Sequence, residues 1–213
     1  MRNVLTFLLL LFSLLCNGQS PKLFTADREL SSSLINQIYQ DRNGFIWIAT
    51  EDGLNRYDGA KFTIYKHEPN NEHSLAHNFV RTVFEDSKGH LLIGTYIGIQ
   101  MYDPATDNFT PLAKLEDTGE TLESNINSFI ERKNGEIWVS GNVLCKLDIK
   151  DHLLTVRKVD IAVTSPGSLF EDKKQNVWMA KGEEPRNAYR PYKSEHHRQP
   201  SDNRLLISLV PLG

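Results

Sequence analysis

Residues 41–59, DRNGFIWIATEDGLNRYDG, carry three glycines around one short apolar run. Each glycine follows an Asn or Asp, as in tight turns, because glycine adopts the positive φ angles that a Cβ disfavours. Between the turns, apolar and polar positions alternate with the period of two that strands show. This stretch therefore predicts short antiparallel strands joined by hairpins.

The same pattern returns along the chain at a constant offset, which is typical of repeat proteins. A second copy follows the first closely, a third has a shorter middle turn, and a fourth stops near residue 182. We assign structural roles to the recurring residues, since turn and core residues are needed in every repeat. They are Asp41, Gly44, Trp47, Gly53, Asp58, Asp86, Gly89, Gly98, Asp103, Gly135, Trp138, Asp148, Asp172 and Trp178.

Four strands fit into the first copy, at residues 34–40, 45–50, 53–57 and 61–66. A repeat of this length with four strands is the blade of a β-propeller. We therefore expect an all-β fold, a partial β-propeller with about three and a half four-stranded antiparallel blades. Trp47 and its equivalents are expected to pack between blades. The expected blades span residues 33–74, 78–121, 124–164 and 166–182.

The chain has 213 residues, of which 39% are hydrophobic and 24% charged, as in globular proteins. Its net charge of -3 lacks the basic footprint of proteins that bind nucleic acids through the phosphate backbone. Nucleic acid is therefore not an expected partner.

The first residues have the form of a secretory signal peptide, with Arg2 before an apolar run. Cleavage after Gly18 would assign residues 1–18 to the signal and residues 19–182 to the propeller; the alternative is a lipid anchor on Cys16. After cleavage Cys145 would be alone, so no intramolecular disulfide is expected. The sequence predicts a periplasmic or secreted protein.

The phrase DRNGFIWIATEDGLNRYDGAKFTIYKH, with the preceding LSSSLINQIYQ, closely resembles the two-component regulator propeller repeat of bacterial sensor proteins. The resemblance covers residues 30–182. It implies the extracytoplasmic ligand-sensing part of a hybrid two-component histidine kinase, often responsive to carbohydrate breakdown products. The parent protein would be dimeric and anchored in the inner membrane. No kinase motif is visible in the sequence, so we expect this chain to have no enzymatic activity and no cofactor.

Two other functional classes remain open, a secreted propeller lyase or hydrolase and a protein-interaction module. Glu51, Asp52 and Asp58 offer carboxylates for acid–base chemistry. However, Asp58 returns as Asp103 and Asp148, which suits a structural role in each blade better than one active site.

Four residues beside the turns are candidates for binding a small-molecule ligand such as an oligosaccharide, because aromatic rings and planar hydrogen-bonding groups suit hydroxyl-rich molecules. They are Arg56, Tyr57, Tyr96 and Gln100. His73 and His77 have a spacing that could place two imidazoles on one helical face for zinc, but no third ligand is identifiable. We expect no metal site.

Residues 183–213 break the repeat, and their prolines oppose strand formation. We interpret this segment as the product of a reading-frame change, with a genuine tail as the alternative. Residues 22–28 are a candidate for the strand that would complete a last blade. Because open sheet edges favour association, we expect the isolated product to fold poorly or to oligomerise.

Overall fold

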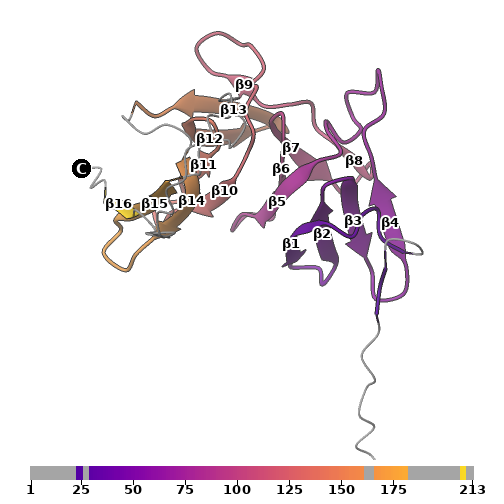
Figure 1. Cartoon of the computed structure of the whole chain (residues 1–213). Coiled ribbons are helices and arrows are strands. Elements are labelled where there is room, and N and C mark those ends of the chain that lie inside the picture. The colour runs from indigo at the N-terminus through magenta and orange to yellow at the C-terminus, as the bar shows by residue number, and fades with distance from the viewer. Residues whose placement is uncertain (1–22, 26–28, 161–165, 182–206, 210–213) are drawn as a thin grey trace, which may run out of the picture.

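The computed structural model describes residues 23–25, 29–160, 166–181 and 207–209, and all regular elements within them are strands. The strands form four sheets that fan out around a common centre without closing (Figure 1). The predicted all-β, partial propeller fold is confirmed. The described part of the chain holds no helix long and apolar enough to cross a membrane. The predicted signal peptide lies outside the described residues.

Each sheet is built from consecutive strands paired mostly as antiparallel hairpins. In the first sheet the strand bounds agree with the predicted ones within one residue. The first sheet contains β1 (Ile35–Gln40), β2 (Ile46–Thr50), β3 (Gly53–Tyr57) and β4 (Phe62–Tyr65). The second contains β5 (Val80–Glu85), β6 (Leu91–Thr95), β7 (Ile99–Asp103) and β8 (Asn108–Phe109). The third contains β10 (Ser128–Glu131), β11 (Ile137–Ser140), β12 (Leu144–Lys150) and β13 (Leu153–Lys158), and the fourth begins with β14 (Pro166–Glu171) and β15 (Val177–Lys181).

Two short strands depart from the predicted pattern. β9 (Lys114–Leu115), from the link after the second sheet, pairs in parallel with β13 as a fifth strand of the third sheet. β16 (Ile207–Leu209) pairs antiparallel with β15, although it belongs to the segment predicted as a non-repeat tail. The alternation of Ile207 and Leu209 around Ser208 was a strand signal that the neighbouring prolines obscured. Residues 23–25, within the segment predicted as a closing strand, form none.

The first strands of the sheets, β1, β5, β10 and β14, follow one another along the concave side of the fan (Figure 1). The apolar cores lie between neighbouring sheets. Trp47, fully buried in the first sheet, reaches Tyr102 of the second with a ring distance of 4.9 Å. Phe84 of the second sheet stacks on Phe129 of the third at 5.9 Å. Large side chains thus join each sheet to the next one.

The turn between the first and second strands is held by an aspartate in the first and fourth sheets. Asp41 Oδ1 accepts the backbone N–H groups of Asn43 and Phe45 at 3.0 Å, and its Oδ2 accepts the indole N–H of Trp47 at 2.8 Å. Asp172 does the same for its turn and for the indole of Trp178. One carboxylate therefore caps the turn with one oxygen and accepts the indole N–H of the tryptophan with the other.

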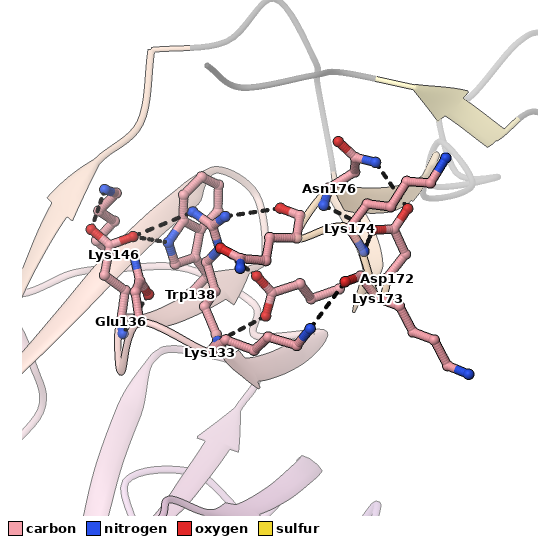
Figure 2. Close-up of polar contacts among 12 residues, drawn as sticks. Lys133, Glu136, Trp138, Lys146, Asp172, Lys173, Lys174 and Asn176 are labelled. Atoms are coloured by element: carbon pink, nitrogen blue, oxygen red, sulfur yellow. Dashed lines mark hydrogen bonds and ion pairs between the residues drawn. The ribbon is translucent and has the colours of Figure 1, made fainter.

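An aspartate also holds this turn in the second sheet, whereas the third sheet has none at this position. Asp86 caps its own turn and bonds the His90 ring at 2.7 Å, because the tryptophan position holds a leucine. In the third sheet Arg132 occupies the aspartate position, and Trp138 donates its indole N–H to Glu136 at 3.1 Å (Figure 2). Glu136 also accepts from Lys146 Nζ at 2.6 Å. A carboxylate at a different position thus replaces the missing aspartate.

Candidate functional site

A cavity of about 1210 Å³ lies at one end of the second, third and fourth sheets, where strand turns and inter-sheet links meet. It collects side chains from β5, the β6–β7 turn, the link before β10, the β11–β12 turn and β14. The lining residues are Arg81, Tyr96, Ile97, Leu112, Thr121, Glu123, Ser124, Asn125, Asn127, Gly141, Asn142, Gly167 and Ser168. A volume of this size accommodates a small ligand.

Two buried polar atoms in the cavity wall have no partner. Among the described residues, only Arg81 Nε and Asn125 Oδ1 are buried side-chain nitrogen or oxygen atoms without a hydrogen bond. Arg81 is held by a 2.9 Å hydrogen bond to Asn127 Oδ1, and its guanidinium lies 5.6 Å from the centre of the Phe79 ring. An unsatisfied buried group costs about 1–3 kcal/mol. One buried donor and one buried acceptor on residues of the cavity lining therefore remain unsatisfied.

The link carrying Asn125 is fixed against both the second and the third sheets. Asn142 donates its backbone N–H to Ser124 Oγ at 3.0 Å, and Ile126 donates to the Thr95 carbonyl at 3.0 Å. A Cβ added at Gly141 would come within 2.4 Å of the Asn125 carbonyl oxygen. Only glycine permits this close approach, so the link and the β11–β12 turn form one preorganised wall.

One aromatic ring, that of Tyr96, lines the cavity and packs against two neighbouring rings. Tyr96 is 53% exposed, and its ring lies 5.6 Å from His77 and 6.0 Å from Phe79. Burial, followed by the nearby His67, lowers the pKa of His77, so its ring is neutral at pH 7. The rim thus presents an accessible tyrosine ring without an added positive charge.

The side chains that line the cavity are mostly polar. Amide and hydroxyl side chains dominate, with one cation, Arg81, and one carboxylate, Glu123. A glycosidase of the usual type needs two carboxyl groups across the substrate. In the part of the chain that the structure describes, no group of three His, Cys, Asp or Glu residues could hold a metal ion. His73 and His77 instead contact the Phe109 carbonyl and the Phe79 N–H.

The predicted candidate Arg56 lies away from this cavity, between the first and second sheets. Its guanidinium bonds Asp107 Oδ1 at 2.9 Å and the Tyr102 hydroxyl, while Tyr65 donates to the same carboxylate at 2.6 Å. Burial opposes ionisation of Asp107, but the hydrogen bonds from Tyr102 and Tyr65 hold its pKa below its usual value. This cluster ties the outer strands of the two sheets together.

The other predicted candidates are also dispersed. Tyr57 stacks on Phe62 at 4.6 Å and donates its hydroxyl to the Gly59 carbonyl. Gln100 is 1% exposed, and its amide bonds backbone groups of Ala76, Ser74 and Thr110. Tyr96 alone among the four lines the cavity. Ligand binding by these four residues stays a prediction.

The sequence analysis did not identify Arg81 or Asn125 as candidates. Both lie outside the strong repeat pattern, in positions that vary between copies. Arg81 stands where the first and third copies have Asn36 and Asn127. A charged residue replacing asparagine at one repeat position was a usable signal, since repeats differ where function differs.

Comparison with known proteins supports the repeat assignment. The family model described as the two-component regulator propeller matches residues 29–52 and 74–96. "Histidine kinase P4" of Formosa agariphila is 39% identical over 83 residues, which are 36% of this chain and 6% of that protein. The chain therefore spans a small fraction of this relative.

Solved structures share the fold. The extracellular domain of a hybrid two-component system from B. thetaiotaomicron aligns with a TM-score of 0.58 and 21% identity, covering 73% of this chain and 21% of that one. Virginiamycin B lyase from Staphylococcus aureus aligns with a TM-score of 0.54 and 15% identity, covering 75% of this chain and 52% of the lyase. At these identities the likeness shows the propeller fold alone. Together with the family match, this shows a propeller in which two segments, residues 29–52 and 74–96, are similar to the two-component regulator propeller.

Proposed function

We propose that this chain is the ligand-binding part of an extracytoplasmic sensor in a two-component system. The family match and the histidine kinase relative support this role. The predicted signal peptide, residues 1–18, supports location outside the cytoplasm. The parent would be a dimeric histidine kinase in the inner membrane, and the propeller would supply ligand recognition.

The ligand that suits the cavity best is an oligosaccharide. The observation that carries this proposal is the pair of unpartnered polar atoms, Arg81 Nε and Asn125 Oδ1, on residues that line the same cavity as the exposed Tyr96. A sugar hydroxyl both donates and accepts hydrogen bonds, and the apolar face of a sugar ring stacks on an aromatic side chain. One sugar unit could therefore satisfy both atoms while it contacts the tyrosine.

The signal would pass without chemistry on the ligand. Since the cavity is lined by the second, third and fourth sheets, a ligand that contacts all three favours one arrangement of the blades. Such a shift in population biases how sensor subunits pack. Its size is limited by the difference in affinity between the two arrangements.

Isothermal titration calorimetry with neutral, acidic and amino oligosaccharides tests the proposal. We expect binding by the wild-type chain, and at least about tenfold weaker binding by Arg81→Ala and Tyr96→Ala, the loss of roughly 1.4 kcal/mol. Arg157→Ala is the matched control, because Arg157 is exposed on β13, away from the cavity wall.

Two results would contradict the proposal. Unchanged affinity in both cavity variants would place the ligand elsewhere. New products detected by mass spectrometry after incubation with the oligosaccharides would favour the lyase or hydrolase alternative.

A further inference from the structure

Arg81 stands where two other sheets have an asparagine that bonds the next sheet. Asn36 of the first sheet donates from Nδ2 to the Val80 carbonyl of the second sheet at 2.7 Å. Asn127 of the third sheet donates from Nδ2 to the Pro166 carbonyl of the fourth sheet at 3.0 Å. In the described structure Arg81 makes no such bond to a carbonyl, and its Nη1 donates to the Asn127 side chain instead. The arginine therefore replaces a recurring inter-sheet hydrogen bond without reproducing it.

The charge of Arg81 is not compensated by a carboxylate in the described part of the chain. Arg81 is half-buried, and arginine keeps its positive charge in proteins. Other arginines that reach a neighbouring sheet form an ion pair there: Arg42 with Glu85 at 2.6 Å, Arg56 with Asp107 at 2.9 Å and Arg132 with Glu171 at 3.3 Å. Arg81 forms no ion pair with any described residue. A partly buried charge without a partner is unfavourable, so Arg81 differs from these arginines in what it contributes to the fold.

The guanidinium of Arg81 is held through one of its nitrogens and the face of its plane. Nη1 bonds Asn127 Oδ1 at 2.9 Å, and the Phe79 ring centre lies 5.6 Å from the guanidinium carbon. Nε is buried without a partner, and Nη2 makes no hydrogen bond to a described residue and is reached by solvent. The N–H groups of Nε and Nη2 point the same way, and this edge of a guanidinium donates paired hydrogen bonds to carboxylates and similar anions. An anionic group that reaches Nη2 therefore also lies beside Nε.

The surroundings of Arg81 contain little negative charge that would oppose an anion. Glu123 is the one carboxylate among the residues that line the cavity, and it is exposed, so solvent and salt screen its charge. Arg81 also borders a second cavity of about 270 Å³, and the described residues that line it include no Asp or Glu. The local field at the guanidinium is therefore favourable for a negatively charged group.

We propose that the ligand of the cavity is an acidic oligosaccharide, whose carboxylate or sulfate group pairs with the Arg81 guanidinium. This inference rests on the proposed function, because it concerns the ligand of the same cavity. The anionic group supplies the counter-charge that the described fold does not supply, while a sugar ring contacts Tyr96, which lines the same cavity. Hydrogen bonds between charged groups are about twice as strong as neutral ones, so Arg81 selects acidic sugars over neutral sugars of the same shape.

Calorimetry on the full chain with matched trisaccharides tests the selection. The pairs are galacturonic acid against galactose and glucuronic acid against glucose, with a sulfated galactose trisaccharide as a further probe. We expect the acidic member to bind at least about tenfold more tightly than the neutral one. The difference should shrink as the salt concentration rises, because salt screens the ion pair. A preference for the sulfated or for the carboxylated probe supports the pairing and identifies the anionic group.

Arg81→Asn separates a role in binding from a role in the fold. It installs the residue of the first and third sheets, which can again bond the carbonyl of the next sheet, at Ile126. We expect its urea midpoint to equal or exceed that of the wild-type chain, while acidic and neutral sugars bind almost equally. Arg81→Lys keeps the charge without the paired donors and should keep part of the preference. Glu123→Gln, in the same cavity lining, is the control and should keep the full preference or raise it.

Four results would overturn the inference, and they separate it from the proposed function. Equal binding of acidic and neutral sugars by the wild-type chain would overturn the inference alone. Binding of none of these sugars would overturn the proposed oligosaccharide ligand and the inference with it. A preference that survives Arg81→Asn would place the anionic group elsewhere. A lower urea midpoint of Arg81→Asn with unchanged sugar selection would show that the arginine only stabilises the fold.

Discussion

The third and fourth sheets satisfy equivalent indole groups, those of Trp138 and Trp178, with different residues. Figure 2 shows the residues around both turns. In the fourth sheet Asp172 caps the turn and accepts the Trp178 N–H at 2.9 Å. In the third sheet Arg132 stands at the aspartate position, and Glu136 accepts the Trp138 N–H. The requirement conserved between the sheets is a carboxylate at the indole, not a residue at one position.

The arginine in place of the aspartate also changes which residues the turn contacts. Arg132 stacks over Trp138 at 5.1 Å and reaches the fourth sheet, where it bonds Glu171 Oε1 at 3.3 Å and the Gln175 carbonyl at 3.0 Å. The carboxylate oxygens of Asp172 instead accept hydrogen bonds from Lys174 and Asn176 of its own turn. Arg132 thereby makes an inter-sheet contact that an aspartate at its position does not make; in the first sheet the residue after the aspartate, Arg42, makes the equivalent ion pair with Glu85 at 2.6 Å.

The largest effect should come from removing the tryptophans. Trp138 is 2% exposed, whereas Trp178 is half-buried in the described structure. Trp138→Ala should cost about 3–5 kcal/mol of unfolding free energy, and Trp178→Ala clearly less. Urea unfolding followed by circular dichroism measures both, and equal losses would contradict the difference in burial.

Arg132→Ala should have the second largest effect. The arginine side chain is 15% exposed, and its loss removes two contacts to the fourth sheet and leaves Glu171 Oε1 without its cation. Hydrogen bonds of charged groups contribute about 1.5–3 kcal/mol. We expect a loss in this range from urea midpoints.

Lys133→Ala is the matched control for this substitution. Its backbone N–H bond to Glu171 survives the change, and the lost Nζ contact to the Lys173 carbonyl is exposed. The midpoint should therefore move little. A loss as large as that of Arg132→Ala would contradict the attribution of that effect to the contacts of the Arg132 guanidinium.

A smaller effect, an increase in unfolding free energy, is expected from relieving the backbone strain in the turn between β14 and β15. Gln175 has a φ of 68°, where the third sheet has Gly135 at 83°. The left-handed conformation destabilises a residue with a Cβ by about 1–2 kcal/mol. A glycine avoids this cost, but it loses more backbone entropy on folding, which offsets part of the gain. Gln175→Gly should raise the unfolding free energy by about 0.5–1 kcal/mol. Gly135→Ala should lower it, since the Cβ would meet no neighbour and only the backbone is strained.

Acid should produce the smallest effect, because both carboxylates are reached by solvent. A hydrogen bond from Lys146, then Asn134 and Trp138, lowers the pKa of Glu136 to about 2, and bonds from Asn176 and Trp178 lower that of Asp172 to about 2. Both pKa values lie below those of unfolded carboxyls. Their stabilisation is therefore complete above about pH 4.5 and is lost as the pH falls towards 2. Urea midpoints between these pH values should fall less for Glu136→Gln and Asp172→Asn; identical profiles would contradict the assignment.

The fold was accessible from the sequence, but the cavity was only partly so. The turns at Gly44 and Gly53 and the alternating strands are local patterns, and they predicted the first sheet within one residue. Tyr96 was named, but Arg81 and Asn125 were not, since they meet only when two sheets and a link pack together. Gln100 appeared suitable for a ligand, whereas packing buries it against backbone groups.

The sequence by itself determined the repeat, the order of the hairpin strands and the resemblance to two-component regulator propellers. These follow from periodicity and turn chemistry, which act over a few residues. Only the tertiary structure decided which polar atoms remain unpartnered, that Glu136 replaces an aspartate, and that Ile38 is exposed while Val83 is buried. The physical reason is that burial and hydrogen-bond satisfaction depend on the neighbouring sheet, and equivalent positions of a repeat have different neighbours.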